Sequence, residues 1–146
     1  MKKILTIITI LSLVLLAGCS QTDENLPEIG VAIYKYDDTY ISTVKNSLIN
    51  EAQGKAQLLL NDGKGDQATQ NDQIDLLIEK GVDVLLVNVV DVGAAQTIVN
   101  KAKTANIPII FFNREPSEAV LKSYDKARFI GTNAKDAGVI QGENNC

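Results

Sequence analysis

The side chains best able to do chemistry are carboxylates, amides and aromatic rings that follow apolar runs typical of buried strands. They are Tyr36, Asp37, Asp38 and Tyr40 in one loop, Asn61 and Asp62 in a second, Asn88 and Asp91 in a third, and Asn113, Arg114 and Glu115 in a fourth. Asp and Asn can make paired hydrogen bonds to neighbouring hydroxyls, and an aromatic face can cover the apolar C–H patch of a sugar ring. The pattern therefore favours an uncharged sugar as ligand.

A structural role is the alternative for each of these residues. Asp38 or Thr39 could cap the first helix, because both side chains can accept a backbone N–H at a helix start. Asn113 could be a turn former ahead of Pro116. Residue type and spacing leave both readings open.

The composition excludes several functional classes. The 146-residue chain has no His and no Trp, which removes His-based metal sites and His-dependent nucleophilic catalysis. Lys and Arg total 14 against 18 Asp and Glu, and the pI is near 4.8, so binding to nucleic-acid phosphates is disfavoured. With 45% hydrophobic and 22% charged residues, the chain has the composition of one globular domain.

Two alternatives from other classes have weaker support. A carboxylate-pair hydrolase would use Asp38 with Asp91 or Glu115, but no spacing rule supports such a pair. A phospho-accepting receiver domain would use the acids Asp37 and Asp38, yet it needs an acceptor Asp directly after the third strand, where Asn88 stands. Because no organised nucleophile or base is present, we expect a binding protein and no enzyme.

Apolar runs alternate with helical periodicity from residue 29 onward. The expected strands are 29–34, 56–60, 84–87, 108–112 and 127–130, and the expected helices are 41–48, 66–80, 95–102, 117–124 and 134–141. Without hairpin signals, consecutive strands require crossover connections, which predicts an α/β fold with a three-layer parallel sheet covered by helices on both faces. Gly81 is placed to cap a helix, and residues 62–66 read as a solvated turn rather than a phosphate loop.

The first residues are typical of a targeting segment. Lys2 and Lys3 precede an apolar run that ends in Leu-Ala-Gly-Cys, which looks like a bacterial lipobox. We expect residues 1–18 to be a lipoprotein signal peptide and Cys19 to be the lipidated N-terminus of an extracytoplasmic, membrane-anchored protein. Residues 19–28 are polar and read as a tether between lipid and fold.

Several segments together resemble one family. They are 29–38 (IGVAIYKYDD), 67–77 (QATQNDQIDLL), 111–117 (FFNREPS) and 123–127 (SYDKA). These segments are similar to those of bacterial glucose/galactose-binding proteins, a type I periplasmic binding protein family that supplies the extracytoplasmic receptor of a sugar ABC transporter. The resemblance extends from residue 29 to about residue 141.

The resemblance implies a receptor whose two lobes close on one hexose, which could be galactose, glucose or methyl-galactoside. Asp38 falls where the family has a carboxylate that binds a sugar hydroxyl, and Asn113 where it has an amide that does the same. Tyr40 falls where the family typically has a Phe that stacks on the sugar. Gly131, Thr132 and Asn133 fall at a crossing between the lobes, which implies a hinge.

The resemblance also sets expectations for domains and partners. Residues 29–131 would be an incomplete first lobe, and 132–146 the hinge and the start of a second lobe, so we expect the chain to be an N-terminal fragment. The family's calcium site lies in the second lobe, so no cofactor and no metal ligand is expected here. Implied partners are a hexose and an ABC transporter permease, and a chemoreceptor or sensor is the alternative.

Overall fold

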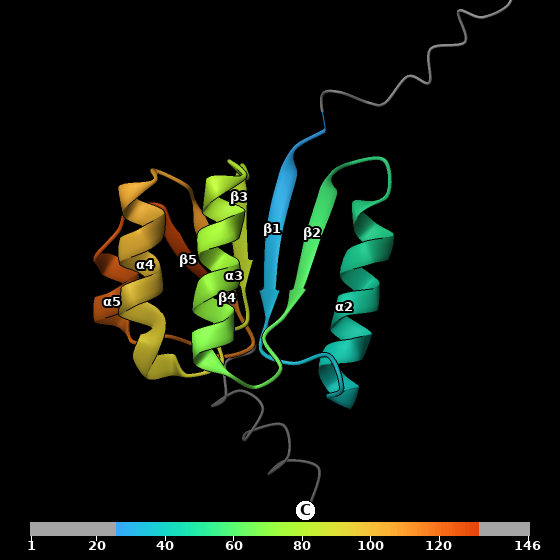
Figure 1. The fold of residues 1–146 in the computed structure, drawn as a ribbon, viewed down its shortest axis with the longest axis horizontal. Coiled ribbons are helices and arrows are strands. Elements are labelled where there is room, and N and C mark those ends of the chain that lie inside the picture. Colours follow the sequence, from blue (N-terminus) through green and yellow to red (C-terminus); the bar gives the residue numbers. More distant parts are fainter. Residues whose placement is uncertain (1–25, 132–146) are drawn as a thin grey trace, which may run out of the picture.

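The computed structural model describes residues 26–131, which form a five-stranded parallel sheet with helices on both faces (Figure 1). The strands are β1 (Glu28–Ile33), β2 (Gln57–Asp62), β3 (Val84–Val87), β4 (Ile109–Phe112) and β5 (Ala127–Ile130). The helices are α2 (Thr39–Ala52), α3 (Gln67–Glu79), α4 (Ala95–Thr104) and α5 (Glu118–Lys122), with a short 3-10 turn, η2 (Val92–Ala94), before α4. The predicted α/β class and parallel sheet are confirmed.

Some expectations from the sequence lie outside the described residues. These are the signal peptide, Cys19, the hinge residues Thr132 and Asn133, and the helix expected at 134–141. Within residues 26–131, no helix is both long enough and apolar enough to cross a membrane.

The order of strands across the sheet is β2-β1-β3-β4-β5. All four neighbouring pairs are parallel, with Ala32 of β1 opposite Asn61 on one side and Val87 on the other. The carboxyl ends of the strands therefore meet at a single edge of the sheet, which we call the rim. The chain leaves β1 toward β2 on one side and later returns to β3 on the other, so the strand order reverses between β1 and β3.

Two apolar layers hold the helices on the sheet. On one face, α3, α4 and α5 pack over the larger core, whose fully buried members include Ile74, Leu85, Ile98, Ile109 and Phe111. On the other face, α2 packs over a smaller core built on Val31, Ile33, Ile41 and Phe112. Alternate residues of a strand point to opposite faces, so β1 and β4 each contribute to both layers.

Boundaries predicted from the sequence differ from the structure in three strands, of which β4 differs least, since it begins at Ile109 and not at Pro108. β1 begins at Glu28, whose N–H donates to Asp83 Oδ2 at 2.8 Å, one residue before the predicted start. β2 continues through Asn61 and Asp62, which pair with Ala32 and Ile33 of β1. The expected helix stop at Gly81 is confirmed, since this residue has a left-handed φ of +76°.

Candidate functional site

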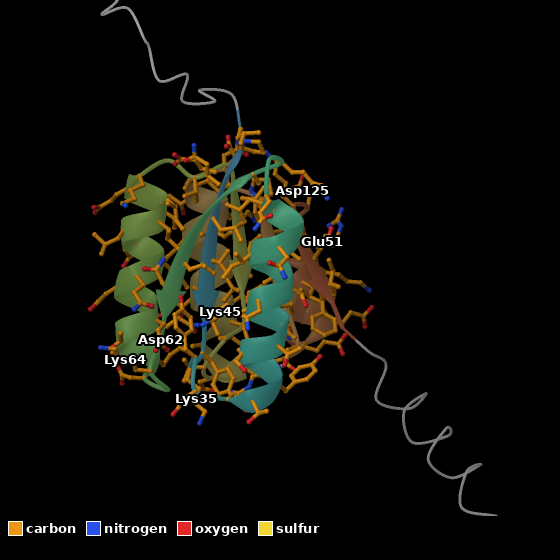
Figure 2. The ribbon with its side chains drawn as sticks, turned by 90° about the vertical axis from the view of Figure 1, so that its right-hand side faces the viewer. Lys35, Lys45, Glu51, Asp62, Lys64 and Asp125 are labelled. Atoms are coloured by element: carbon orange, nitrogen blue, oxygen red, sulfur yellow. The ribbon has the colours of Figure 1, made fainter. Side chains whose placement is uncertain are left out.

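The rim between β1 and β3 is the candidate site, because the strand order reverses there and parallel α/β sheets bind their ligands at such a point, outside the carboxyl ends of the strands. The loops that follow β1, β3 and β4 lie around it, since these three strands are neighbours in the sheet. Figure 2 shows Lys35, Asp62 and Lys64 at this end of the molecule and Asp125, which precedes β5, at the opposite end.

Asp38 lies at the rim with both carboxylate oxygens engaged. Its Oδ1 accepts the Ile41 N–H at 2.8 Å as the N-cap of α2, so the capping alternative is confirmed. Its Oδ2 accepts the Tyr34 hydroxyl at 2.6 Å. A carboxylate oxygen has two lone pairs, so each atom keeps the capacity to accept a ligand hydroxyl. Capping and ligand binding are compatible at this residue.

The contact with Tyr34 also sets the charge state of Asp38. The Tyr34 hydrogen bond, followed by the Ile41 N–H, holds the pKa of Asp38 below its usual value. The same hydrogen bond raises the pKa of Tyr34, and burial raises it further. The two shifts agree, because a neutral hydroxyl is donating to an ionised carboxylate. Asp38 is therefore an acceptor-only group at neutral pH.

Arg114 ties three loops of the rim together. Its guanidinium carbon lies 4.1 Å from the centroid of the Tyr34 ring, a cation–π contact. Its Nη1 donates to the carbonyl oxygens of Val90 at 2.5 Å and Val89 at 3.4 Å. Arg114 thus connects the loop after β4 to the loops after β1 and β3. The sequence placed Arg114 at the rim but gave no indication of this role.

Glutamines of α3 fix the loop after β3. Gln70 is fully buried; its Nε2 donates to Asn88 O at 2.9 Å, and its Oε1 accepts the Val90 N–H at 2.9 Å. Gln67 Oε1 accepts the Asp91 N–H at 2.7 Å. The sequence did not predict that these glutamines bind the loop after β3. A Gln among the apolar positions of a helix is nevertheless a signal, because a buried amide needs hydrogen-bond partners.

Asn113 and Tyr40 are more open to solvent than Asp38. Asn113 directly follows β4, is exposed and has a left-handed φ of +64°, so it does form a turn. Tyr40, in the first turn of α2, has 64% of its surface exposed. Arg114 contacts Tyr34, which donates to Asp38, so the loop that carries Asn113 is physically connected to Asp38.

Asn88 differs from its predicted role as an open rim residue. It is fully buried between β1 and α3. Its backbone N–H donates to Ala32 O at 2.8 Å, and its backbone carbonyl accepts a hydrogen bond from the side chain of Gln70 in α3. Its side-chain amide is enclosed in the protein and has no hydrogen-bond partner among the described residues. Asn88 is therefore closed to direct contact with a ligand in this structure.

The turn at 62–66 packs against the end of β1. The Gly63 N–H donates to Ile33 O and the Gly65 N–H to Tyr34 O, each at 2.7 Å. Lys64 and Gly65 are exposed, as expected for a solvated turn, whereas Gly63 is buried. Because Gly65 bonds the carbonyl of Tyr34, this turn supports the backbone that carries the Tyr34 hydroxyl.

Other acids of the rim have structural roles. Asp66 caps α3 by accepting the Thr69 N–H at 2.7 Å, and Asp91 caps η2 by accepting the Gly93 N–H at 2.8 Å. Within residues 26–131, no three Asp, Glu, Cys or His side chains gather in a way that could hold a metal ion. Gly131 follows β5, where a Cβ would collide with the ring of Phe129.

Comparison with known proteins finds relatives that are all described as binding proteins. A family model described as periplasmic binding protein domain matches residues 29–145. The D-galactose/methyl-galactoside binding periplasmic protein MglB of Haemophilus influenzae is 42% identical over 98% of this chain and 44% of its own length. The ribose import binding protein RbsB of Bacillus subtilis is 27% identical over 84% of this chain and 44% of its own length. The chain spans less than half of both relatives.

A solved structure agrees with these relatives in fold. An ABC transporter solute binding protein from Bacillus halodurans, crystallised with bound myo-inositol, superimposes with a TM-score of 0.65 at 30% identity. The match covers 73% of this chain and 36% of that chain. The parallel sheet and its helices are therefore those of solute binding proteins.

Gly63→Ala tests the support of the rim by the turn at 62–66. A Cβ at Gly63 would lie 3.0 Å from Ile33 O and 3.1 Å from Tyr34 O, so the backbone at the end of β1 must move. We expect the free energy of unfolding in urea to fall by roughly 1–3 kcal/mol, and the NMR signals of the Tyr34 ring to shift. Gly54→Ala is the control for the Tyr34 signals: its left-handed φ of +68° strains a side chain and so also lowers stability, but no atom lies within 4 Å of the added Cβ, and the Tyr34 signals should stay unchanged. Unchanged Tyr34 signals in Gly63→Ala would contradict the assigned support.

Proposed function

The chain belongs to the periplasmic binding protein family, and on that premise we propose that it supplies a sugar-binding lobe of an extracytoplasmic receptor for an ABC importer. The observation that carries this proposal is the rim itself. An ionised carboxylate, braced by Tyr34 and by the N-terminus of α2, lies at the reversal point of the sheet, and Arg114 links it to the loop of Asn113.

The proposed ligand is a hexose, either galactose or glucose, or a methyl-galactoside. Support comes from the name of the Haemophilus relative, which states D-galactose and methyl-galactoside as what that protein binds. Neutral sugars also fit the chemistry of the rim, because the proposed contacts are a carboxylate, an amide and an aromatic ring. The importer permease is the proposed protein partner.

Each proposed residue has a distinct role in binding. The Asp38 carboxylate accepts hydrogen bonds from sugar hydroxyls, and the Asn113 amide donates one and accepts another. The exposed ring of Tyr40 covers the C–H face of the sugar, and its hydroxyl adds a polar group at the edge of that contact. No bond is made or broken in this role, so the proposed function is binding without catalysis.

A second lobe is part of the proposal. Three contacts from one side leave the sugar in water, where each hydrogen bond competes with solvent, so one lobe alone gives about millimolar affinity or weaker. Closure of two lobes excludes water and strengthens every polar contact. We propose Gly131, Thr132 and Asn133 as the hinge, because a Gly can absorb a large change of backbone angles.

Sugar binding is tested with a chimera in which this chain is followed by the second lobe of the Haemophilus relative. Calorimetry should detect hexose binding, and Asp38→Ala and Asn113→Ala should each weaken it by roughly 5- to 150-fold, since a buried hydroxyl then lacks its partner. Asp83→Ala and Asn106→Ala are matched controls. Asp83 also accepts a backbone N–H, that of Glu28 at 2.8 Å, and Asn106 also has a left-handed φ, but the two residues precede β3 and β4 at the opposite edge of the sheet.

The comparison with the controls distinguishes a loss of sugar contacts from a loss of stability. If the controls weaken binding as much as Asp38→Ala and Asn113→Ala do, the rim residues act only through stability. If both rim variants bind hexose like the unchanged chimera, the residue assignment is wrong.

A lipid anchor at Cys19 is the proposed means of membrane attachment. The sequence Leu-Ala-Gly-Cys at residues 16–19 supports it, together with the charged and apolar residues before it. Mass spectrometry of membrane-extracted protein should find a diacylglyceryl-modified N-terminus at Cys19, and Cys19→Ala should remove the modification. An N-terminus that retains Met1 would contradict the proposal.

A further inference from the structure

We propose that Tyr34 is the positioning residue for the Asp38 carboxylate, and that Arg114 in turn fixes the ring of Tyr34. Asp38 is the proposed sugar ligand, so this inference rests on the proposed function. It adds two residues whose proposed role is to determine where the carboxylate points.

The Tyr34 hydroxyl restrains a rotation that the helix cap leaves free. The Ile41 N–H holds only Oδ1 of Asp38, and the terminal torsion of an Asp side chain is broad, so the plane of the carboxylate could still turn. A second donor on Oδ2, at 2.6 Å, removes this freedom. The unused lone pairs then point in one direction before a ligand arrives, which lowers the ordering cost of binding.

Arg114 restrains Tyr34 from the other side. Its guanidinium stacks 4.1 Å from the ring centroid and is anchored on Val90 O, and Val90 is itself held by Gln70 of α3. The neighbour of Arg114 in the chain is Asn113, the second proposed sugar ligand. The contact therefore relates the position of Asn113 to that of Asp38 through Tyr34, although the two residues belong to different loops.

The charges around Asp38 define the expected pH effect. The groups that act on it are the Tyr34 hydroxyl, the Ile41 and Tyr40 N–H groups and the Lys35 ammonium, and Lys35 is paired with Asp37 at 3.3 Å. The Tyr34 hydrogen bond is the largest cause that lowers the pKa of Asp38. Loss of the hydroxyl must raise this pKa, so the carboxylate protonates, and stops accepting on that oxygen, at a higher pH than in the unchanged chain.

The test is an NMR titration of the Asp38 side-chain carboxyl carbon in the 146-residue chain and in Tyr34→Phe. The variant keeps the ring that Arg114 stacks on and removes only the hydroxyl. We expect the titration midpoint of Asp38 to move to higher pH, while the Ile41 amide signal keeps its capped position. Tyr124→Phe is the matched control, because Tyr124 also donates its hydroxyl, to Ile107 O at 3.2 Å, but in the core away from Asp38. An unmoved Asp38 midpoint in Tyr34→Phe would overturn the proposal.

A second measurement tests Arg114 and separates this inference from the proposed function. Arg114→Lys keeps the charge but loses the planar stacking, so the Asp38 midpoint should also move up, whereas Arg128→Lys, at an exposed position of β5, should leave it unchanged. With galactose added, Tyr34→Phe should raise the dissociation constant roughly 3- to 30-fold. If the unchanged chain and the chimera both fail to bind any hexose, the proposed function is wrong, and the carboxyl titration still decides whether Tyr34 positions Asp38.

Discussion

The reversal of strand order between β1 and β3 is the constraint on which the candidate site depends. Neighbouring β1 and β3 send their following loops in opposite directions, so the space outside their carboxyl ends is not filled by a crossover. Polar contacts and one cation–π contact connect the loops at this rim, from α3 through Gln70 to the β3 loop, and from there through Arg114 to Tyr34 and Asp38.

This arrangement suits binding better than catalysis. A catalytic carboxylate usually needs a pKa moved toward neutrality so that it can exchange protons with a substrate. Asp38 shows the opposite shift, since its hydrogen bonds favour the charged form. An acceptor that is ionised at neutral pH, held in the orientation proposed above, can select hydroxyl groups by their positions. The physical design of the rim thus agrees with the membership of the chain in a family of binding proteins.

Local sequence patterns predicted the strands well because buried parallel strands read as continuous apolar runs. β3 and β5 have the predicted bounds, Val84–Val87 and Ala127–Ile130. β2 extends further, through the polar residues Asn61 and Asp62. These residues pair with the end of β1, and such pairing depends on the backbone of the partner strand and not on the hydrophobicity of β2 itself.

The contacts of the rim were less predictable than the strands. Asp38 as a helix cap was recognisable from residue type, since capping is a local interaction. Two other contacts join residues far apart in the sequence. Arg114 stacks on Tyr34, and Gln70 makes hydrogen bonds to the backbone of Asn88 and Val90. Only the fold brings these residues together. For the same reason Asn88 was expected to be open at the rim, whereas contacts from α3 and β1 bury it.

The most direct measurement is a map of amide NMR shifts in the 146-residue chain as galactose or glucose is added to high millimolar concentration. We expect saturable shifts confined to Asp38 and Tyr40, at the start of α2, and to Asn113, after β4, while Gly54 and Gly81, which precede β2 and β3 at the opposite edge, stay unchanged. Shifts that are largest away from the rim, or that never saturate, would contradict the claim that this edge of the sheet binds the sugar.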